Sequence, residues 1–214
     1  FALLKKCELS ENDHIRLMER AKKKKIMFSS TPFSREAADF LDRLGVAAFK
    51  TGSGELTNIP LLEHIARKNK PMIISTGMSS IKEITNTVNA VKKLNKEIIL
   101  MQCTSTYPAE YKNINLGAIE ILRKRFGFPV GLSDHSYGIY TALGAVALGA
   151  VVLEKHFTLD RSWPGPDQKA SIIPEELREL VRGTMALQQA LGDKKDVIKA
   201  EVPVRKMANE SIVS

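Results

Sequence analysis

The chain has 214 residues, of which 43% are hydrophobic and 26% charged, as is typical of a globular protein rather than a disordered or fibrous one. No apolar run approaches the roughly 20 residues that a membrane-spanning helix needs. The formal charge of +8 comes from lysines and arginines spread along helical patterns, without interleaved aromatic residues. We therefore expect neither a nucleic-acid nor a membrane partner.

The two cysteines, Cys7 and Cys103, lie far apart and lack the spacing of metal ligands. Cys103 lies in an apolar run, where a reduced cysteine acts as a small hydrophobic side chain. The first residues lack the cleavage pattern of a secretory signal. We therefore expect a reducing compartment and a cytoplasmic protein.

Six short apolar runs recur along the chain, and a helical pattern follows each of them. Because the runs are continuously apolar, they predict strands that are buried on both faces of a parallel sheet. The expected strands are residues 26–30, 46–51, 72–76, 98–104, 130–133 and 151–156. Capping residues and apolar spacing predict helices over 34–44, 58–66, 80–94, 116–126, 137–148 and 174–191.

This order of elements leaves two architectures, an open doubly wound sheet or a (β/α)8 barrel of which about six βα units are present. The Gly-rich phosphate-binding turns of a doubly wound nucleotide fold are missing from the sequence. Nearly every expected strand ends in polar residues, and the carboxyl ends of all barrel strands converge on one mouth. The sequence therefore favours an α/β fold of the TIM-barrel type.

Lys50 lies at the end of the second expected strand and is a candidate anion ligand or Schiff-base nucleophile. Ser53 and Ser75 follow nearby strand ends, and hydroxyl and backbone N–H donors around a lysine suit a phosphate or carboxylate. Glu55 adds a carboxylate that could transfer a proton or bind sugar hydroxyls. An exposed lysine without a ligand is the alternative interpretation.

His135 and His156 end two neighbouring expected strands. A single histidine at a strand end is usually structural, but two on adjacent strands favour a shared metal or proton-transfer site. A divalent ion there could polarise a carbonyl group. Tyr107 and Asp167 lie in the loops 104–108 and 160–171, which either contact substrate or serve only as connections.

Several long stretches together resemble the sialic acid synthase family, the N-acetylneuraminate synthases and related nonulosonic acid synthases. They are "FKTGSGELTNIPLLEHIA", "PMIISTGMSS", "QCTSTYPAEYKNINL", "VGLSDHSYGI" and "VALGAVVLEKHFTLDRSWPGPDQKAS". The resemblance covers nearly the whole chain. It implies a condensation of phosphoenolpyruvate with the open-chain aldehyde of an N-acyl hexosamine, such as N-acetylmannosamine, with release of phosphate.

The resemblance also implies roles for individual residues. His135 and His156 would hold a divalent ion, Mn²⁺ or Mg²⁺, and Glu55 and Lys50 would lie at the reacting centre. Asp134 would orient a neighbouring group. The phosphoenolpyruvate or sugar contacts would come from Thr31, Lys50, Ser53, Ser75, Ser105, Tyr107, Ser133 and Asp167.

The sequence departs from this family in ways that limit the expectation. Two βα units that precede the equivalent of Phe1, and a small C-terminal antifreeze-like domain, are expected to be missing. We predict a truncated barrel domain over 1–192 and a linker over 193–214, and the family implies a homodimer. Gln102 occupies a position where many bacterial members have His, and Ser105 replaces a larger polar residue.

Three interpretations therefore remain. The first is an active sialic acid synthase, and legionaminate or pseudaminate synthases differ from it only in the sugar. The second is an inactive fragment or a binding module that keeps the pocket. The third is another phosphoenolpyruvate-condensing barrel that uses a sugar phosphate.

Overall fold

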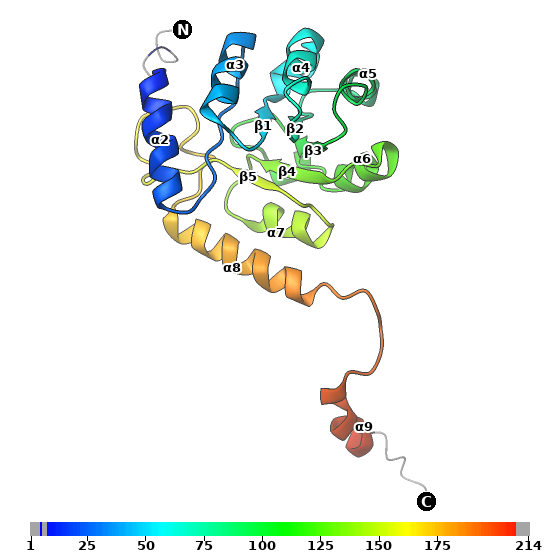
Figure 1. Ribbon diagram of the computed structural model, residues 1–214. Helices are drawn as coiled ribbons and strands as arrows, with labels where there is room; N and C mark the ends of the chain where they lie inside the picture. Colours follow the sequence, from blue (N-terminus) through cyan, green and yellow to red (C-terminus); the bar gives the residue numbers. More distant parts are fainter. Residues whose placement is uncertain (1–4, 6–7, 209–214) are drawn as a thin grey trace, which may run out of the picture.

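The computed structural model describes residue 5 and residues 8–208 (Figure 1). Its centre is a curled sheet of five parallel strands in the order β1-β2-β3-β4-β5, so each strand pairs with the next one along the chain. The sheet forms a half-barrel, with helices on its outer face (Figure 1). The strands are β1 (Phe49–Thr51), β2 (Met72–Ser75), β3 (Ile98–Cys103), β4 (Val130–Asp134) and β5 (Leu153–Lys155).

Helices alternate with the strands and largely match the sequence-based expectation. Ser34 caps α3 (Arg35–Leu44) by accepting a hydrogen bond from Ala37 N, and Gly45 ends that helix with φ +86°. Asn58 and Ser80 cap the next two helices in the same way. The helices are α2 (Glu11–Lys23), α3 (Arg35–Leu44), α4 (Ile59–Ala66), α5 (Ile81–Val91), α6 (Ala118–Phe126), α7 (Tyr140–Ala147), α8 (Pro174–Ala190) and α9 (Val202–Ala208), with single 3-10 turns η1 (Ser53–Glu55), η2 (Tyr111–Asn113) and η3 (Lys199–Glu201).

The prediction of a strand over residues 26–30 is wrong. This segment is irregular and joins no ladder within the described part of the chain. Ile26 and Met27 are 65% and 85% exposed, and of the apolar residues in the segment Phe28 packs against the core. An apolar run becomes a strand only where a neighbouring strand pairs with its backbone. Here one side chain is partly buried, but no strand pairs with the segment in the described part of the chain.

Alternation along each strand divides the sheet into two chemically different faces. The outer face packs against the helices through fully buried side chains such as Phe49, Met72, Ile74, Leu100 and Leu132. Because successive side chains point to opposite faces, the residues between these belong to the inner face of the half-barrel. The inner face carries the polar residues that surround the central space, which include Lys50, Ser75, Cys103, Ser133 and Glu154.

The curl of the sheet brings its first and last strands within ion-pair distance. Lys50 Nζ on β1 lies 3.1 Å from Glu154 Oε2 on β5. A flat sheet would separate these strands by four interstrand spacings, roughly 19 Å. The strand ends therefore surround one space, as the barrel hypothesis requires.

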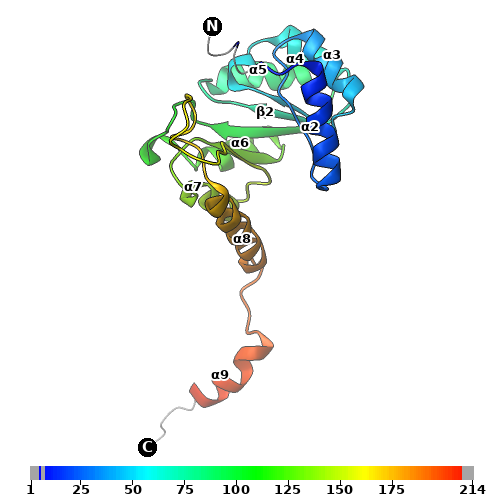
Figure 2. The ribbon, with the colours of Figure 1, turned by 90° about the vertical axis from the view of Figure 1, so that its left-hand side faces the viewer.

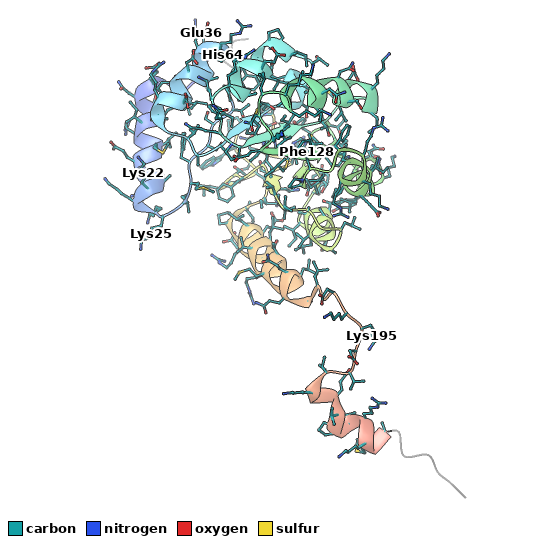
Figure 3. The ribbon with its side chains drawn as sticks, turned by 45° about the vertical axis from the view of Figure 1, so that its right-hand side comes forward. Lys22, Lys25, Glu36, His64, Phe128 and Lys195 are labelled. Atoms are coloured by element: carbon teal, nitrogen blue, oxygen red, sulfur yellow. The ribbon has the colours of Figure 1, made fainter. Side chains whose placement is uncertain are left out.

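The remaining elements lie outside this space. After α8 an irregular segment leads to η3 and α9, which lie away from the sheet (Figure 2). Lys22 and Lys25 at the end of α2, and Lys195 beyond α8, project from separate parts of the molecule (Figure 3). None of the described helices is long and apolar enough to cross a membrane.

Candidate active site

The register of the strands places the polar side chains in layers at the carboxyl end of the sheet. Cys103 pairs with Ser133, and Ser133 pairs with Glu154, so these three residues share one level. His135 and His156 each follow two residues later on the same face, which sets them one layer higher. The sequence-based grouping of strand ends is thus realised in space.

Lys50 forms the basic side of the site. Its ammonium group donates hydrogen bonds to Ser75 Oγ at 2.8 Å and to the Thr51 carbonyl at 3.2 Å, and it pairs with Glu154. The side chain is only 13% exposed, whereas that of Glu154 is 45% exposed. An incoming anion could therefore replace the exposed carboxylate while Ser75 keeps the lysine in place.

Gly77 lies where three polar side chains from the ends of β1 and β3 converge. Its N–H donates to Ser53 Oγ at 3.1 Å. A Cβ on Gly77 would lie 2.4 Å from Ser105 Oγ, 2.7 Å from Ser53 Oγ and 3.0 Å from Cys103 Sγ. Glycine is thus the residue that permits this close approach, because any side chain would displace the hydroxyl and thiol groups.

The two histidines lie side by side and share an aromatic neighbour. The imidazole centroids of His135 and His156 are 5.2 Å apart. The Tyr107 ring lies 4.1 Å from the first and 5.4 Å from the second, measured between centroids. Partial burial of Tyr107 raises its pKa, so the phenol stays protonated and can donate a hydrogen bond.

His135 has a defined orientation. Its Nδ1 lies 2.8 Å from the Thr104 carbonyl, which can only accept, so Nδ1 carries the proton in the neutral ring and Nε2 is left as the acceptor nitrogen. Burial opposes the charged form, yet the contacts with Cys103 and the Thr104 carbonyl raise the pKa of His135. Burial likewise opposes ionisation of Cys103, but the contacts with His135 and Ser53 lower the pKa of this thiol.

His156 completes the pair from β5. Burial lowers its pKa, with the Asp167 carboxylate acting against that effect from 3.9 Å. The ring is therefore mainly neutral near pH 7, which is the form that binds metal ions. Asp167 itself is held by its backbone, because Ser171 Oγ and Ala170 N both donate to its carbonyl.

The residues present fit a divalent ion held by two imidazoles. A neutral His135 with Nδ1 bonded to a carbonyl has the tautomer typical of metal-bound histidine. In the described ranges, no three His, Cys, Asp or Glu side chains form a ready metal-binding group. Water and substrate oxygens would have to fill the other coordination positions, as they do for Mn²⁺ and Mg²⁺ in substrate complexes.

Asp134 belongs to the outer face and is almost completely buried. Its carboxylate accepts hydrogen bonds from Ser136 N at 2.9 Å, Thr141 Oγ1 at 2.8 Å and Lys155 Nζ at 2.9 Å. Burial lowers the pKa of Lys155, although Asp134 favours its charged form. Hydrogen bonds on the outer face of the sheet therefore fix the turn that contains His135.

Two of the candidate residues, Glu55 and Thr31, lie farther from Lys50 and the histidines. The Glu55 carboxylate accepts a 2.7 Å hydrogen bond from Asn58, and in the described part of the chain no bond links it to Lys50 or the histidines. Thr31 lines a groove beside α2 and α3. Its segment nevertheless passes the mouth, because the Phe33 ring lies 3.7 Å from a Cβ built on Gly52.

The structure also explains one departure and adds residues that the sequence did not single out. Gln102 lies on the outer face, where it donates to the Ile114 carbonyl at 2.9 Å, so the inner face is unaffected. Glu154, Cys103 and Gly77 were not among the predicted site residues. Counting back two residues from His156 would have found Glu154. Cys7 lies outside the described residues.

Comparisons with known proteins show which family the chain belongs to. The N,N'-diacetyllegionaminic acid synthase of Legionella pneumophila is 44% identical, over 99% of this chain and 61% of that protein. The human N-acetylneuraminate-9-phosphate synthase is 39% identical, over 97% of this chain and 58% of its own length. This chain thus spans about six-tenths of the length of these relatives.

A solved structure gives the same result. The N-acetylneuraminic acid (sialic acid) synthetase of Leptospira borgpetersenii superposes with a TM-score of 0.91 at 38% identity, covering 98% of this chain and 74% of that one. The NeuB family matches residues 1–196. The chain therefore belongs to the NeuB family, which includes synthases of sialic and legionaminic acids.

Proposed function

We propose that this chain forms the phosphoenolpyruvate- and metal-binding part of a nonulosonic acid synthase. The reaction would join C3 of phosphoenolpyruvate to the aldehyde carbon of an N-acyl hexosamine. The aldehyde oxygen takes up a proton, one water is consumed, and phosphate leaves from the three-carbon unit. The product is a nine-carbon ulosonic acid.

The observation that carries this proposal is the juxtaposition of a basic cluster and a histidine pair at one end of the half-barrel. Lys50 and Ser75 offer charged and neutral donors to an anion. Ser133 Oγ lies 3.5 Å from His135 Nε2, and Ser133 is the register partner of Glu154, which pairs with Lys50, so the two groups adjoin. A substrate with an anionic part and a reacting carbonyl matches that arrangement.

The residues would divide the work by position. Lys50, Ser53, Ser75 and Ser105 would bind the carboxylate and phosphate of phosphoenolpyruvate, with Thr31 at the rim. Tyr107 and Asp167 would bind and orient the sugar beside the histidines. Glu154 lies between both groups and could accept or return a proton, a role for which Glu55 is the alternative.

A divalent ion, Mn²⁺ or Mg²⁺, held by His135 and His156 would polarise the sugar aldehyde. N-acetylmannosamine and the diacetamido sugars of the legionaminate or pseudaminate type are all candidates for the acceptor. The name of the Legionella relative favours a legionaminate-type sugar.

The proposal is tested by calorimetric titration of phosphoenolpyruvate into the chain, with and without Mn²⁺. Saturable binding is expected, and Mn²⁺ should strengthen it in the wild type but not in His135→Ala. His64→Ala is the matched control, because His64 contacts Asp39 in the outer helical layer and not the site. A folded sample that does not bind phosphoenolpyruvate would refute the proposal.

A second candidate function is a binding module without turnover. A phosphate-release assay distinguishes it from the synthase. The sugars named above are supplied with phosphoenolpyruvate and Mn²⁺. Release of phosphate that depends on the sugar indicates the synthase. Binding without release at any sugar concentration indicates the binding module.

A further inference from the structure

A buried ion pair lies directly behind the two histidines, on the opposite face of the sheet. Asp134 and Lys155 are register partners on β4 and β5, and their side chains are only 1% and 5% exposed. Each precedes one histidine in the chain, Asp134 before His135 and Lys155 before His156. The Lys155 ammonium and the Asp134 carboxylate are 2.9 Å apart.

This pair is the last lateral connection between the two strands before the histidines. The ladder of β4 and β5 ends at the level of Asp134 and Lys155. Beyond it each histidine carbonyl accepts a hydrogen bond from a different segment, His135 from Ala109 N and His156 from Ile172 N. These contacts hold each histidine separately and do not fix the distance between them.

The pair is also tied to the neighbouring helix and turn. Thr141 at the start of α7 donates to Asp134, and Lys155 donates to the Ser136 carbonyl just past His135. Lys155 therefore bonds to the residues on both sides of His135, while its own backbone leads into His156. A shift of β5 relative to β4 would break several of these bonds at once.

We propose that the Asp134–Lys155 ion pair positions the two imidazoles, setting the spacing of His135 and His156 from the outer face of the sheet. Both are positioning residues, because neither faces the inner space. Removing a buried ion pair as a unit can leave a protein folded, so a pair at this place fits a role in specifying geometry. The part of this inference that concerns metal affinity rests on the proposed function, and the imidazole geometry does not.

The test compares two double variants of the full chain. D134N/K155M removes the pair but keeps one acceptor oxygen for Ser136 N, while the amide nitrogen can donate to the Thr141 hydroxyl in place of the lost acceptor. D39N/K68M removes a second lysine–aspartate pair, between α3 and the end of α4, in which the Lys68 side chain is 12% exposed. Asp39 of this control pair contacts His64, which Figure 3 labels in the outer helical layer.

The first measurement needs no metal. In histidine-labelled protein, the NMR signals of His135 and His156 report their distance from the Tyr107 ring and from one another. Both signals should move in D134N/K155M and stay at the wild-type positions in D39N/K68M. Unmoved signals in a folded D134N/K155M protein overturn the inference.

The second measurement is the binding of Mn²⁺ alone. Loss of a group that orients metal ligands weakens affinity by about 10- to 100-fold, and this is expected for D134N/K155M and not for the control. Unchanged Mn²⁺ affinity in the folded variant also overturns the inference. If the wild type does not bind Mn²⁺ while the imidazole signals respond as expected, the proposed metal fails and the positioning role stands.

Should D134N/K155M not fold, Lys155→Arg supplies the same test. Arginine keeps the positive charge, but its planar guanidinium group is larger than the lysine ammonium group. The strands must therefore adjust for it to pair with Asp134. Both imidazole signals should then move. A folded K155R protein with both signals unmoved contradicts the inference.

Discussion

Two lysine–carboxylate pairs join the strands of this half-barrel, and they differ in what surrounds them. Lys50 and Glu154 meet on the inner face, where the carboxylate is 45% exposed. Lys155 and Asp134 meet on the outer face, where both side chains are 5% exposed or less. The same chemistry can therefore provide an exchangeable anion site on one face and a fixed structural bond on the other.

The largest expected effect is on stability and comes from the outer pair. Lys155→Met leaves the Asp134 carboxylate buried without its cation, which costs about 3–5 kcal/mol of unfolding free energy. Urea denaturation followed by circular dichroism measures the loss. A loss of unfolding free energy below about 1 kcal/mol is usual for an exposed ion pair. Such a small loss would mean that the buried outer pair stabilises the fold no more than the exposed inner pair does.

The next effect concerns ligand binding and comes from the inner pair. Lys50→Met removes an ion pair with an exposed carboxylate, so unfolding free energy should fall by no more than about 1 kcal/mol. Phosphoenolpyruvate affinity should fall about 10- to 100-fold, because a charge-assisted hydrogen bond contributes roughly 1.5–3 kcal/mol. Calorimetry and urea denaturation on the same sample separate the two effects. Unchanged affinity would mean that Lys50 is not the anion ligand.

Gly77→Ala tests whether the inner face depends on close packing of its polar groups. The added methyl group would displace Ser53 and Ser105, at a cost of about 1–3 kcal/mol and with weaker phosphoenolpyruvate binding. Gly54→Ala is the control, since a Cβ there meets nothing within 4 Å. Equal melting temperatures and equal phosphoenolpyruvate affinities of the two variants would contradict the close packing of Ser53 and Ser105 around Gly77.

The sequence predicted the parts of the fold that depend on local pattern. Continuous apolar runs located the five strands, and capping residues such as Ser34 and Ser80 located helix starts. It failed over residues 26–30, because pairing depends on a neighbouring strand and not on the run itself. The site residues on strand ends, such as Lys50 and His135, could be grouped because parallel strands end at one edge.

What the sequence could not provide was the curl of the sheet and the conformation of its loops. Glu154 gained importance only when β5 came within reach of β1. Glu55 lies two residues after Ser53 in a 3-10 turn, which rotates its side chain by about 240° around the turn axis. Cys103 was interpreted as a small hydrophobic residue, and only the folded chain surrounds it with Ser53, Ser105 and His135.

The smallest effect expected is a pH dependence of stability that belongs to the inner face. Burial lowers the pKa of His156 in the folded chain relative to about 6.5 in the unfolded chain. The unfolded chain therefore binds more protons between these two values, so the contribution of His156 is present above about pH 6.5 and is lost as the pH falls through the folded pKa.

His156→Asn should remove this part of the pH dependence. Unfolding free energies measured between pH 8 and pH 5, in the presence of a chelator, should fall less steeply with acidification in the variant than in the wild type. Parallel curves would show that His156 is as well solvated in the folded chain as in the unfolded one, and the inner face would then lack the desolvated imidazole that distinguishes it from an ordinary surface.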